Sequence, residues 1–188
     1  MAPRIAFAAT CLLAPLFATA AIAADPPAAL PPAVAPAGTA VPPLLARQPL
    51  PRVYSAGQPA VEDWAEIARH GVTTVIDLRP DAERPARDEA AEVRAAGLAY
   101  RQIPVAGAQD LDADAARTLW QAIEAAPGKV LVHCASGNRA GALLAIAAAG
   151  EGGMAPEQAL EAGREGGMTS LEPRVREVLG LPAPSGDP

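Results

Sequence analysis

A cysteine and an arginine five positions later, Cys134 and Arg139, mark the stretch of this chain with the clearest chemical potential. Apolar residues precede and follow them: Val130 to Val132 predict a short buried strand, and Ala140 to Ala149 predict an apolar helix. In such a strand-loop-helix arrangement, loop N–H groups can converge on an anion while the helix N-terminus adds partial positive charge. The spacing therefore predicts an oxyanion site with a thiol at its floor.

The residue types in this loop suit nucleophilic attack on a phosphate-like group. Positive surroundings would favour the thiolate of Cys134 near neutral pH. Arg139 offers a planar fork that matches two oxygens of an anion, and Gly137 allows close approach of the backbone. Taken singly, a cysteine after a strand is usually a small buried hydrophobe and an arginine at a helix start is usually solvated. Their combination favours a reactive site.

The loop sequence H-C-A-S-G-N-R-A resembles the active-site loop of dual-specificity tyrosine phosphatases, H-C-x-x-G-x-x-R, but is one residue shorter. The C-x-x-G-x-R form resembles a bacterial group of phosphatase-like domains that is also found fused to beta-lactamase-like hydrolases. Rhodanese sulfurtransferases have a loop of the same length. The segments S-A-G-Q-P, G-V-T-T-V-I-D-L-R-P-D-A-E and G-L-A-Y-R-Q-I-P-V extend the resemblance to the bacterial group from Val53 to about Gly150. A rhodanese would carry a G-H-I-P-G-A segment, which is absent.

The resemblance implies a cysteine-dependent phosphatase that hydrolyses phosphate monoesters without a metal or another cofactor. Cys134 would attack phosphorus and form a cysteinyl-phosphate, and His133 would order the loop through hydrogen bonds. The guanidinium of Arg139 and the backbone amides of the loop would hold the phosphate oxygens. The phosphate-binding residues would be Ala135, Ser136, Gly137, Asn138 and Arg139.

Hydrolysis of a poor leaving group also needs a general acid. In dual-specificity phosphatases an aspartate follows a strand of the I-P-V type, and here Asp110 is nearest to that position. Asp112 is better explained as the N-cap of a helix, and Asp81, at the same predicted edge of the sheet, is the rival candidate. Asp77 and Arg79 flank the end of a strand and are expected to form a structural pair.

Two residues depart from the phosphatase pattern and predict slow turnover. Ala140 replaces the hydroxyl residue that usually follows the arginine, and Ala135 replaces a basic residue typical of the bacterial group. Two alternatives therefore stay open: a rhodanese-like sulfurtransferase that carries a persulfide on Cys134, and a pseudo-phosphatase that only binds an anion or phosphoprotein.

Strand and helix patterns alternate through the rest of the chain and predict an α/β fold: a single domain with a mostly parallel central sheet flanked by helices. Asp112 and Ser170 are expected to cap helices. Further strands are predicted from Val53 and over 72–78 and 98–103, and further helices over 60–69, 87–96, 113–125, 156–164 and 171–179.

The composition divides the chain into four parts. Residues 1–23 have the features of a cleavable signal peptide, 24–51 form a Pro/Ala-rich linker, 52–181 the phosphatase-like domain and 182–188 a flexible tail. The protein is therefore expected to be periplasmic or secreted, with no stable membrane insertion after cleavage. Cleavage would remove Cys11 and leave Cys134 without an intramolecular disulfide partner.

Charge and composition limit the partners. The formal net charge of −6 and the lack of a basic run argue against nucleic-acid binding. The scattered histidines and cysteines do not predict a metal site. The expected partner is a phosphorylated substrate of unknown type, and the sequence does not indicate the oligomeric state.

Overall fold

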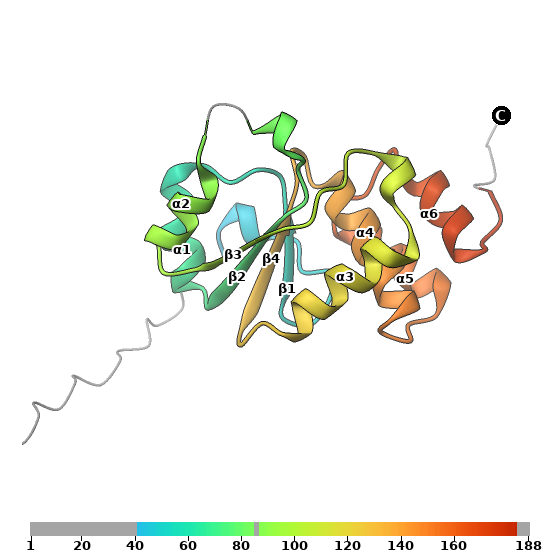
Figure 1. Cartoon of the computed structure of the whole chain (residues 1–188). Coiled ribbons are helices and arrows are strands. Elements are labelled where there is room, and N and C mark those ends of the chain that lie inside the picture. Colours follow the sequence, from blue (N-terminus) through green and yellow to red (C-terminus); the bar gives the residue numbers. More distant parts are fainter. Residues whose placement is uncertain (1–40, 85–86, 184–188) are drawn as a thin grey trace, which may run out of the picture. The chain divides into compact units, whose positions relative to one another are not determined.

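The computed structural model describes residues 41–84 and 87–183 (Figure 1). The predicted signal peptide, the part of the predicted linker over 24–40 and residues 184–188 of the predicted tail lie outside the described residues. Within the described ranges, no helix has both the length and the apolar character needed to cross a membrane.

Four strands within the described residues form one sheet in the order β1-β4-β2-β3, and all neighbouring strands are parallel. The strands are β1 Val53–Ala56, β2 Val72–Asp77, β3 Ala99–Gln102 and β4 Lys129–His133. The register places His133 beside Ala56 on one side and Asp77 on the other, so three strands end together at one edge. Ligands of open parallel sheets bind at this edge, outside the carboxyl ends of the strands. The predicted α/β fold with a parallel sheet is confirmed.

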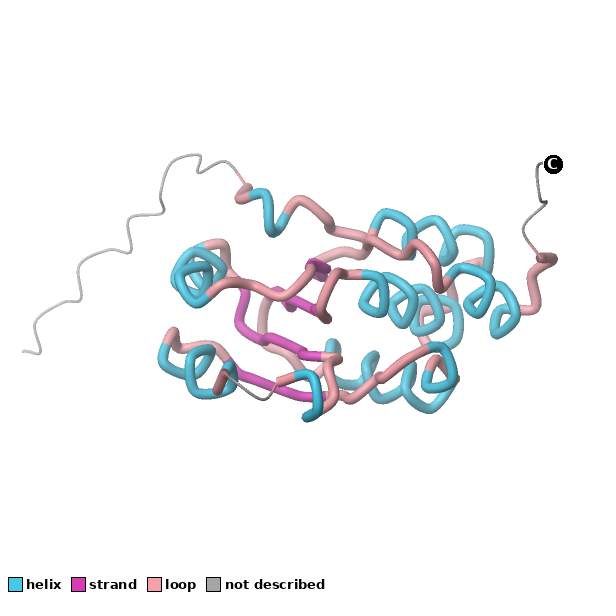
Figure 2. The backbone as a smooth tube through the Cα atoms, turned by 90° about the horizontal axis from the view of Figure 1, so that it is seen from above, coloured by secondary structure: helices cyan, strands magenta, loops and turns pink. Residues whose placement is uncertain are grey.

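Helices cover both faces of the sheet (Figures 1 and 2). The helices are α1 Trp64–Arg69, α2 Glu89–Ala95, α3 Ala113–Glu124, α4 Asn138–Gly150, α5 Pro156–Glu165 and α6 Glu172–Leu179. The alternation of side chains along β4 divides the core: Val130 and Val132 face the cluster that contains α3 and α4, whereas Leu131 faces the cluster under α1 and α2. Helix α4 lies between the sheet and the other helices of its layer, which explains why its side chains are apolar almost all round.

Two predicted helix caps have different outcomes. Asp112 caps α3 as predicted, because its Oδ1 accepts a hydrogen bond of 2.8 Å from the N–H of Ala115. The prediction for Ser170 is wrong: Leu171 holds the N-cap position of α6 and no side chain caps that end. The hydroxyl of Ser170 instead accepts a hydrogen bond from Nδ2 of Asn138, 2.8 Å away.

The end of the predicted linker packs against the domain. A 3₁₀ turn, η1 Pro43–Leu45, places Leu45 in the core with 1% exposure, and Leu50 is 6% exposed. The carbonyl of Arg47 accepts a hydrogen bond of 3.1 Å from the N–H of Ser55. These apolar and backbone contacts cover the outer side of β1, so the packed unit begins before residue 52.

Candidate active site

The loop Cys134 to Arg139 connects β4 to α4 at the sheet edge where the strands end. The helix begins at Asn138, two residues before the predicted start. Gly137 takes a left-handed conformation with φ of 96°, which residues other than glycine rarely adopt. This turn directs the N–H of Gly137 at the sulfur of Cys134, 3.1 Å away. Cys134 is 1% exposed, so its thiol lies at the bottom of the loop and also borders the core.

Several backbone donors of this loop have no backbone acceptor. Within the described part of the chain, the N–H groups of Ala135, Ser136, Asn138 and Arg139 donate to no carbonyl oxygen. Ala135 and Ser136 are exposed, and Asn138 and Arg139 begin α4, so these donors are free to bind an anion at the helix N-terminus. Within the described residues, the predicted phosphate-binding residues thus include four whose amides have no backbone acceptor.

The Arg139 side chain is held on one side by the protein. Its Nη1 donates to Glu83 Oε1 at 2.8 Å and to the Val105 carbonyl at 2.7 Å, and its Nη2 donates to Glu83 Oε2 at 2.6 Å. These bonds use both N–H groups of Nη1 and one N–H of Nη2. The Nε–H and the second N–H of Nη2 remain available along one side of the guanidinium. The hydrogen bonds with Glu83, opposed by burial, and the charge of a Cys134 thiolate raise the pKa of Arg139. The remaining pair of donors is suited to two oxygens of an anion above Cys134.

Glu83 was not predicted from the sequence as a site residue. It ends a short 3₁₀ turn, η3 Asp81–Glu83, in the polar loop that follows β2. The hydrogen bonds from Arg139 hold the pKa of Glu83 below its usual value, so the ion pair is intact at neutral pH. The sequence signal was the placement of this loop at the same sheet edge as Cys134, but nothing in its composition singled out Glu83.

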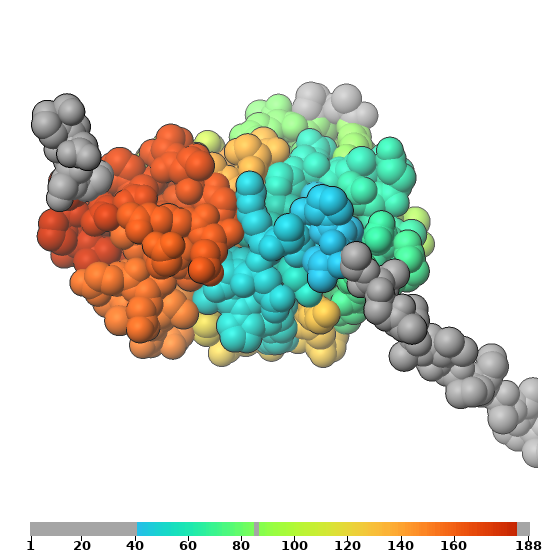
Figure 3. Space-filling model, turned by 180° about the vertical axis from the view of Figure 1, so that it is seen from behind, coloured from blue at the N-terminus to red at the C-terminus, as the bar shows by residue number. Residues whose placement is uncertain are grey.

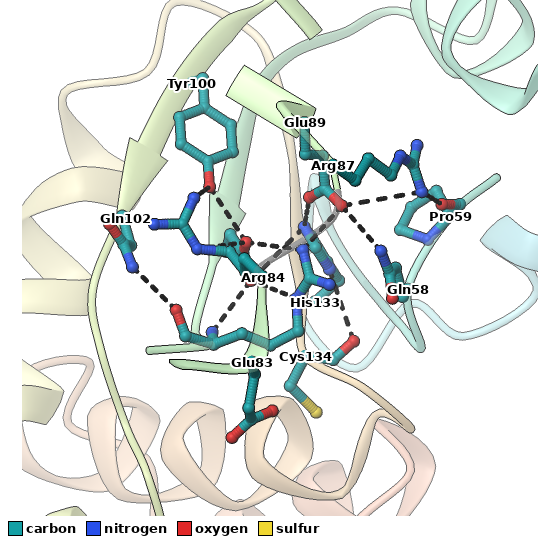
Figure 4. A network of polar contacts seen from close by, with 12 residues as sticks. Gln58, Pro59, Glu83, Arg84, Arg87, Glu89, Tyr100, Gln102, His133 and Cys134 are labelled. Carbon is teal, nitrogen blue, oxygen red and sulfur yellow. Dashed lines mark hydrogen bonds and ion pairs between the residues drawn. The ribbon is translucent and has the colours of Figure 1, made fainter. Parts of the chain in front are cut away.

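A buried ionic network lies behind the loop (Figure 4). Arg79 donates to Asp77 through Nε at 3.0 Å and Nη2 at 2.8 Å, and to Glu89 Oε2 at 2.7 Å. The expected pair of Asp77 and Arg79 is therefore present, and Glu89 from α2 is a third member that the sequence analysis missed. Tyr100 donates to Oδ2 of Asp77 at 3.0 Å.

The charges of this network are balanced by strong contacts. Burial is the largest influence on Asp77 and opposes its ionisation, but the hydrogen bonds from Arg79 and the nearby positive charges together keep the pKa of Asp77 below its usual value. Burial likewise opposes ionisation of Glu89, and its contact with His133 lowers the pKa of Glu89 overall. Both carboxylates are consequently charged at neutral pH.

His133 connects the network to the nucleophile loop. Its Nε2 lies 2.9 Å from Oε1 of Glu89, although the N–H is not aligned with that oxygen and both atoms lack a well-formed hydrogen bond. Its Nδ1 lies 3.5 Å from the carbonyl oxygen of Cys134. His133 is fully buried and has no access to a substrate, so it suits the expected ordering role rather than that of a base.

Asp77, Glu89 and His133 also lie close enough to one another to hold a metal ion, within 4.8 Å. The guanidinium of Arg79 contacts both carboxylates, however, and adds a positive charge at the point where a cation would bind. This donor set therefore fits an internal ion network better than a metal centre.

The three candidate general acids have different environments. Asp110 accepts hydrogen bonds at Oδ2 from the N–H groups of Ala106, at 2.7 Å, and Gly107, at 3.3 Å. Asp112 is the cap of α3 described above. Asp81 is exposed and accepts hydrogen bonds at Oδ1 from Arg84 and Gln102. Asp110 and Asp112 both belong to the connection between β3 and α3, whose Val105 carbonyl accepts a hydrogen bond from Arg139, but the carboxylate of Asp112 is already used as a helix cap.

Comparison with known proteins matches residues 47–151 to the family model described as "Beta-lactamase hydrolase-like protein, phosphatase-like domain". Beta-lactamase hydrolase-like proteins of Xylella fastidiosa strain 9a5c and Agrobacterium fabrum are 36% and 35% identical over 145 and 105 residues, which are 72% and 54% of this chain. The chain spans 33% and 24% of the length of these relatives.

Solved structures share the fold. A proposed phosphatase of Neisseria meningitidis Z2491 is 25% identical with a TM-score of 0.61, and the match covers 71% of this chain and 98% of that one. A cysteine-to-serine form of P. aeruginosa TpbA in complex with pTyr is 23% identical with a TM-score of 0.58, and the match covers 76% of this chain and 88% of that one. These matches confirm the predicted resemblance to phosphatases, and none of the proteins named here favours a sulfurtransferase.

Proposed function

The chain belongs to the phosphatase-like domain family of beta-lactamase hydrolase-like proteins, and on that premise we propose that it hydrolyses phosphate monoesters through a cysteinyl-phosphate on Cys134. One observation carries the proposal: the Cys134 thiol accepts a hydrogen bond from the N–H of Gly137, in a loop whose other amides lack a backbone acceptor within the described residues. The hydrogen bond stabilises a thiolate, and the amides can donate hydrogen bonds to the oxygens of a phosphoryl group.

In the first step, the Cys134 thiolate attacks phosphorus in line with the ester oxygen. A sulfur–phosphorus bond forms as the bond from phosphorus to the ester oxygen breaks, and the departing alkoxide takes a proton from a general acid. The loop amides and the free side of Arg139 hold the other three oxygens, whose charge grows in the transition state. In the second step, water cleaves the sulfur–phosphorus bond and releases inorganic phosphate and the thiolate.

We assign the general acid to Asp110. Its loop is bound to Arg139 through the Val105 carbonyl, and the two amides that hold Oδ2 fix the carboxyl group while Oδ1 stays available. The acid delivers its proton only to the leaving group, so its contribution grows as the leaving group becomes more basic.

The proposal predicts that the purified full chain releases phosphate from p-nitrophenyl phosphate without added metal and that vanadate inhibits it. Cys134→Ser should abolish this activity, and Arg139→Lys should lower it by about a hundredfold or more, because lysine has no planar fork. Asp114→Asn, an exposed change on α3, is the control. Metal-dependent activity that survives Cys134→Ser would contradict the proposal. Transfer of sulfur from thiosulfate to Cys134 without any phosphate release would favour the sulfurtransferase. Binding of vanadate without turnover of any substrate would favour a pseudo-phosphatase.

We also propose export of the protein, on the basis of Arg4, the uncharged apolar run from Ile5 to Ile22 and the small residues Ala21 and Ala23. N-terminal sequencing of the protein recovered from a periplasmic fraction should find a start near Ala24. Recovery of the intact N-terminus from the cytoplasmic fraction would contradict export.

A further inference from the structure

Arg47 lies beside the nucleophile loop, in the segment before β1. Its backbone is fixed there, because Leu45 is buried and the Arg47 carbonyl accepts a hydrogen bond from Ser55. In Figure 3 this first described segment, in blue, lies next to the orange residues near α5.

Two glycines make room for the Arg47 guanidinium. A Cβ atom at Gly137 would lie 2.7 Å from Nη1 of Arg47, and one at Gly167 would lie 2.5 Å from it. Both glycines have positive φ, 96° and 93°. A side chain at either position would therefore strain the backbone and would also collide with the Arg47 guanidinium. Loops that are distant in the sequence therefore converge on this arginine.

Among the residues that the structure describes, the charge of Arg47 has no partner. The side chain is exposed, and within the described part of the chain it forms no ion pair or hydrogen bond with a carboxylate. The chain as a whole has a net charge of −6, so Arg47 supplies local positive charge beside the loop of an otherwise acidic chain. An arginine in this position attracts anions and can bind one in a bidentate manner.

A cavity of about 430 Å³ connects Arg47 with the nucleophile loop. Ser136 from the loop, Gly57 from the turn after β1 and Ser55 from β1 line it together with Arg47 and the residues around η1. Its volume is in the range of sites for small molecules, and the side chains of Ser136 and Arg47 suit a polar, anionic group, whereas the Ser55 hydroxyl already donates to the Gly166 carbonyl.

We propose that Arg47 and this cavity bind a second anionic group of the substrate, so that the preferred substrate is a small phosphate monoester that carries another phosphate or carboxylate. This inference rests on the proposed function, because the scissile phosphate occupies the loop of Cys134 while the second group reaches Arg47. The Arg47 cation then selects substrates by charge and takes no part in bond breaking.

Binding of alkanediol bisphosphates to Cys134→Ser protein, measured by calorimetry, tests the inference. A series of increasing chain length is compared with alkyl monophosphates of the same length. One length should bind about fivefold more tightly than its monophosphate, since an ion pair with an exposed side chain is worth up to that factor. Adding Arg47→Ala should remove the preference, and Arg47→Lys should restore part of it. Arg101→Ala, which removes an exposed charge on the opposite edge strand β3, should preserve it.

A preference that survives Arg47→Ala, or no preference at any length, would overturn the inference. An equal loss for bisphosphates and monophosphates would also overturn it, because Arg47 would then support the loop rather than the ligand. Thermal unfolding of each variant confirms that it is folded. Because binding is read without turnover, a protein that prefers bisphosphates but hydrolyses no ester would refute only the proposed function.

Discussion

Replacing Glu83 with glutamine should lower kcat/KM for p-nitrophenyl phosphate about tenfold, because Glu83 aims the guanidinium of Arg139. The Glu83 carboxylate accepts two hydrogen bonds from Arg139, of 2.8 and 2.6 Å. The Glu83 side chain is 35% exposed and the Arg139 side chain is 12% exposed. A hydrogen bond to a charged group contributes about 1.5–3 kcal/mol when buried, and an exposed ion pair about 1 kcal/mol or less. The partial exposure places this pair near 1.4 kcal/mol, which is about a factor of ten.

The assay compares wild type, Glu83→Gln and Asp81→Asn at neutral pH, where the Glu83 carboxylate is ionised. Asp81 shares the η3 turn with Glu83 but contacts Arg84 and Gln102, so its variant should keep wild-type activity. The lowered pKa of Glu83 means that the pair persists somewhat below the usual value of 4.5 and is lost as the pH falls through the lowered value. The activity difference between wild type and Glu83→Gln should therefore shrink in acid.

An increase in kcat/KM or in vanadate affinity for Glu83→Gln would refute this reasoning. It would mean that Glu83 competes with the substrate for Arg139 instead of orienting it. Unchanged kinetics would mean that the Val105 carbonyl alone is enough to fix the guanidinium.

Asp110→Asn should lower kcat about tenfold more for phenyl phosphate than for p-nitrophenyl phosphate, because the poorer leaving group depends on a proton donor. Equal losses for the two substrates would show that Asp110 is not the general acid. Ala140→Ser should speed breakdown of the cysteinyl-phosphate and raise kcat several-fold, which burst kinetics measure; a slower breakdown would contradict the interpretation of Ala140. Asp77→Asn should reduce the free energy of unfolding by about 3 kcal/mol at pH 7 in urea, since it leaves Arg79 underpaired. The wild type should itself lose stability as the pH falls below the usual pKa values of Glu89 and Asp77, 4.5 and 3.8, toward their lowered values in the folded state. Stability that stays flat as the pH falls below that range would contradict this account of the network.

The local fold was predictable because each element has its own signal. The branched residues of β2 and β4 and the uniformly apolar α4 have hydrophobic patterns that depend little on the rest of the chain. The strand order was not predictable, since the position of β4 between β1 and β2 depends on the packing of the whole sheet. Ser170 was assigned to a cap from its type alone, whereas in the structure Asn138 holds its hydroxyl.

The site was predictable only where its residues are neighbours in sequence. Cys134 and Arg139 belong to one loop, so their types and spacing carried the information. Glu83 lies 56 positions from Arg139, and such a contact leaves no local pattern. Glu89 did leave one, because it precedes Val93 by one helical turn on the buried side of α2, where a carboxylate needs a partner.

The most direct test of the account is a search for phosphate on Cys134 itself. Wild-type protein, in which Ala140 should make breakdown of the intermediate slow, is mixed with p-nitrophenyl phosphate, quenched in acid within the first turnover and analysed by peptide mass spectrometry. The account predicts one phosphoryl group on the peptide that contains Cys134, and none when Cys134→Ser is added. Turnover of the substrate without a phosphorylated Cys134 peptide, or with the phosphoryl group on another residue, would contradict it.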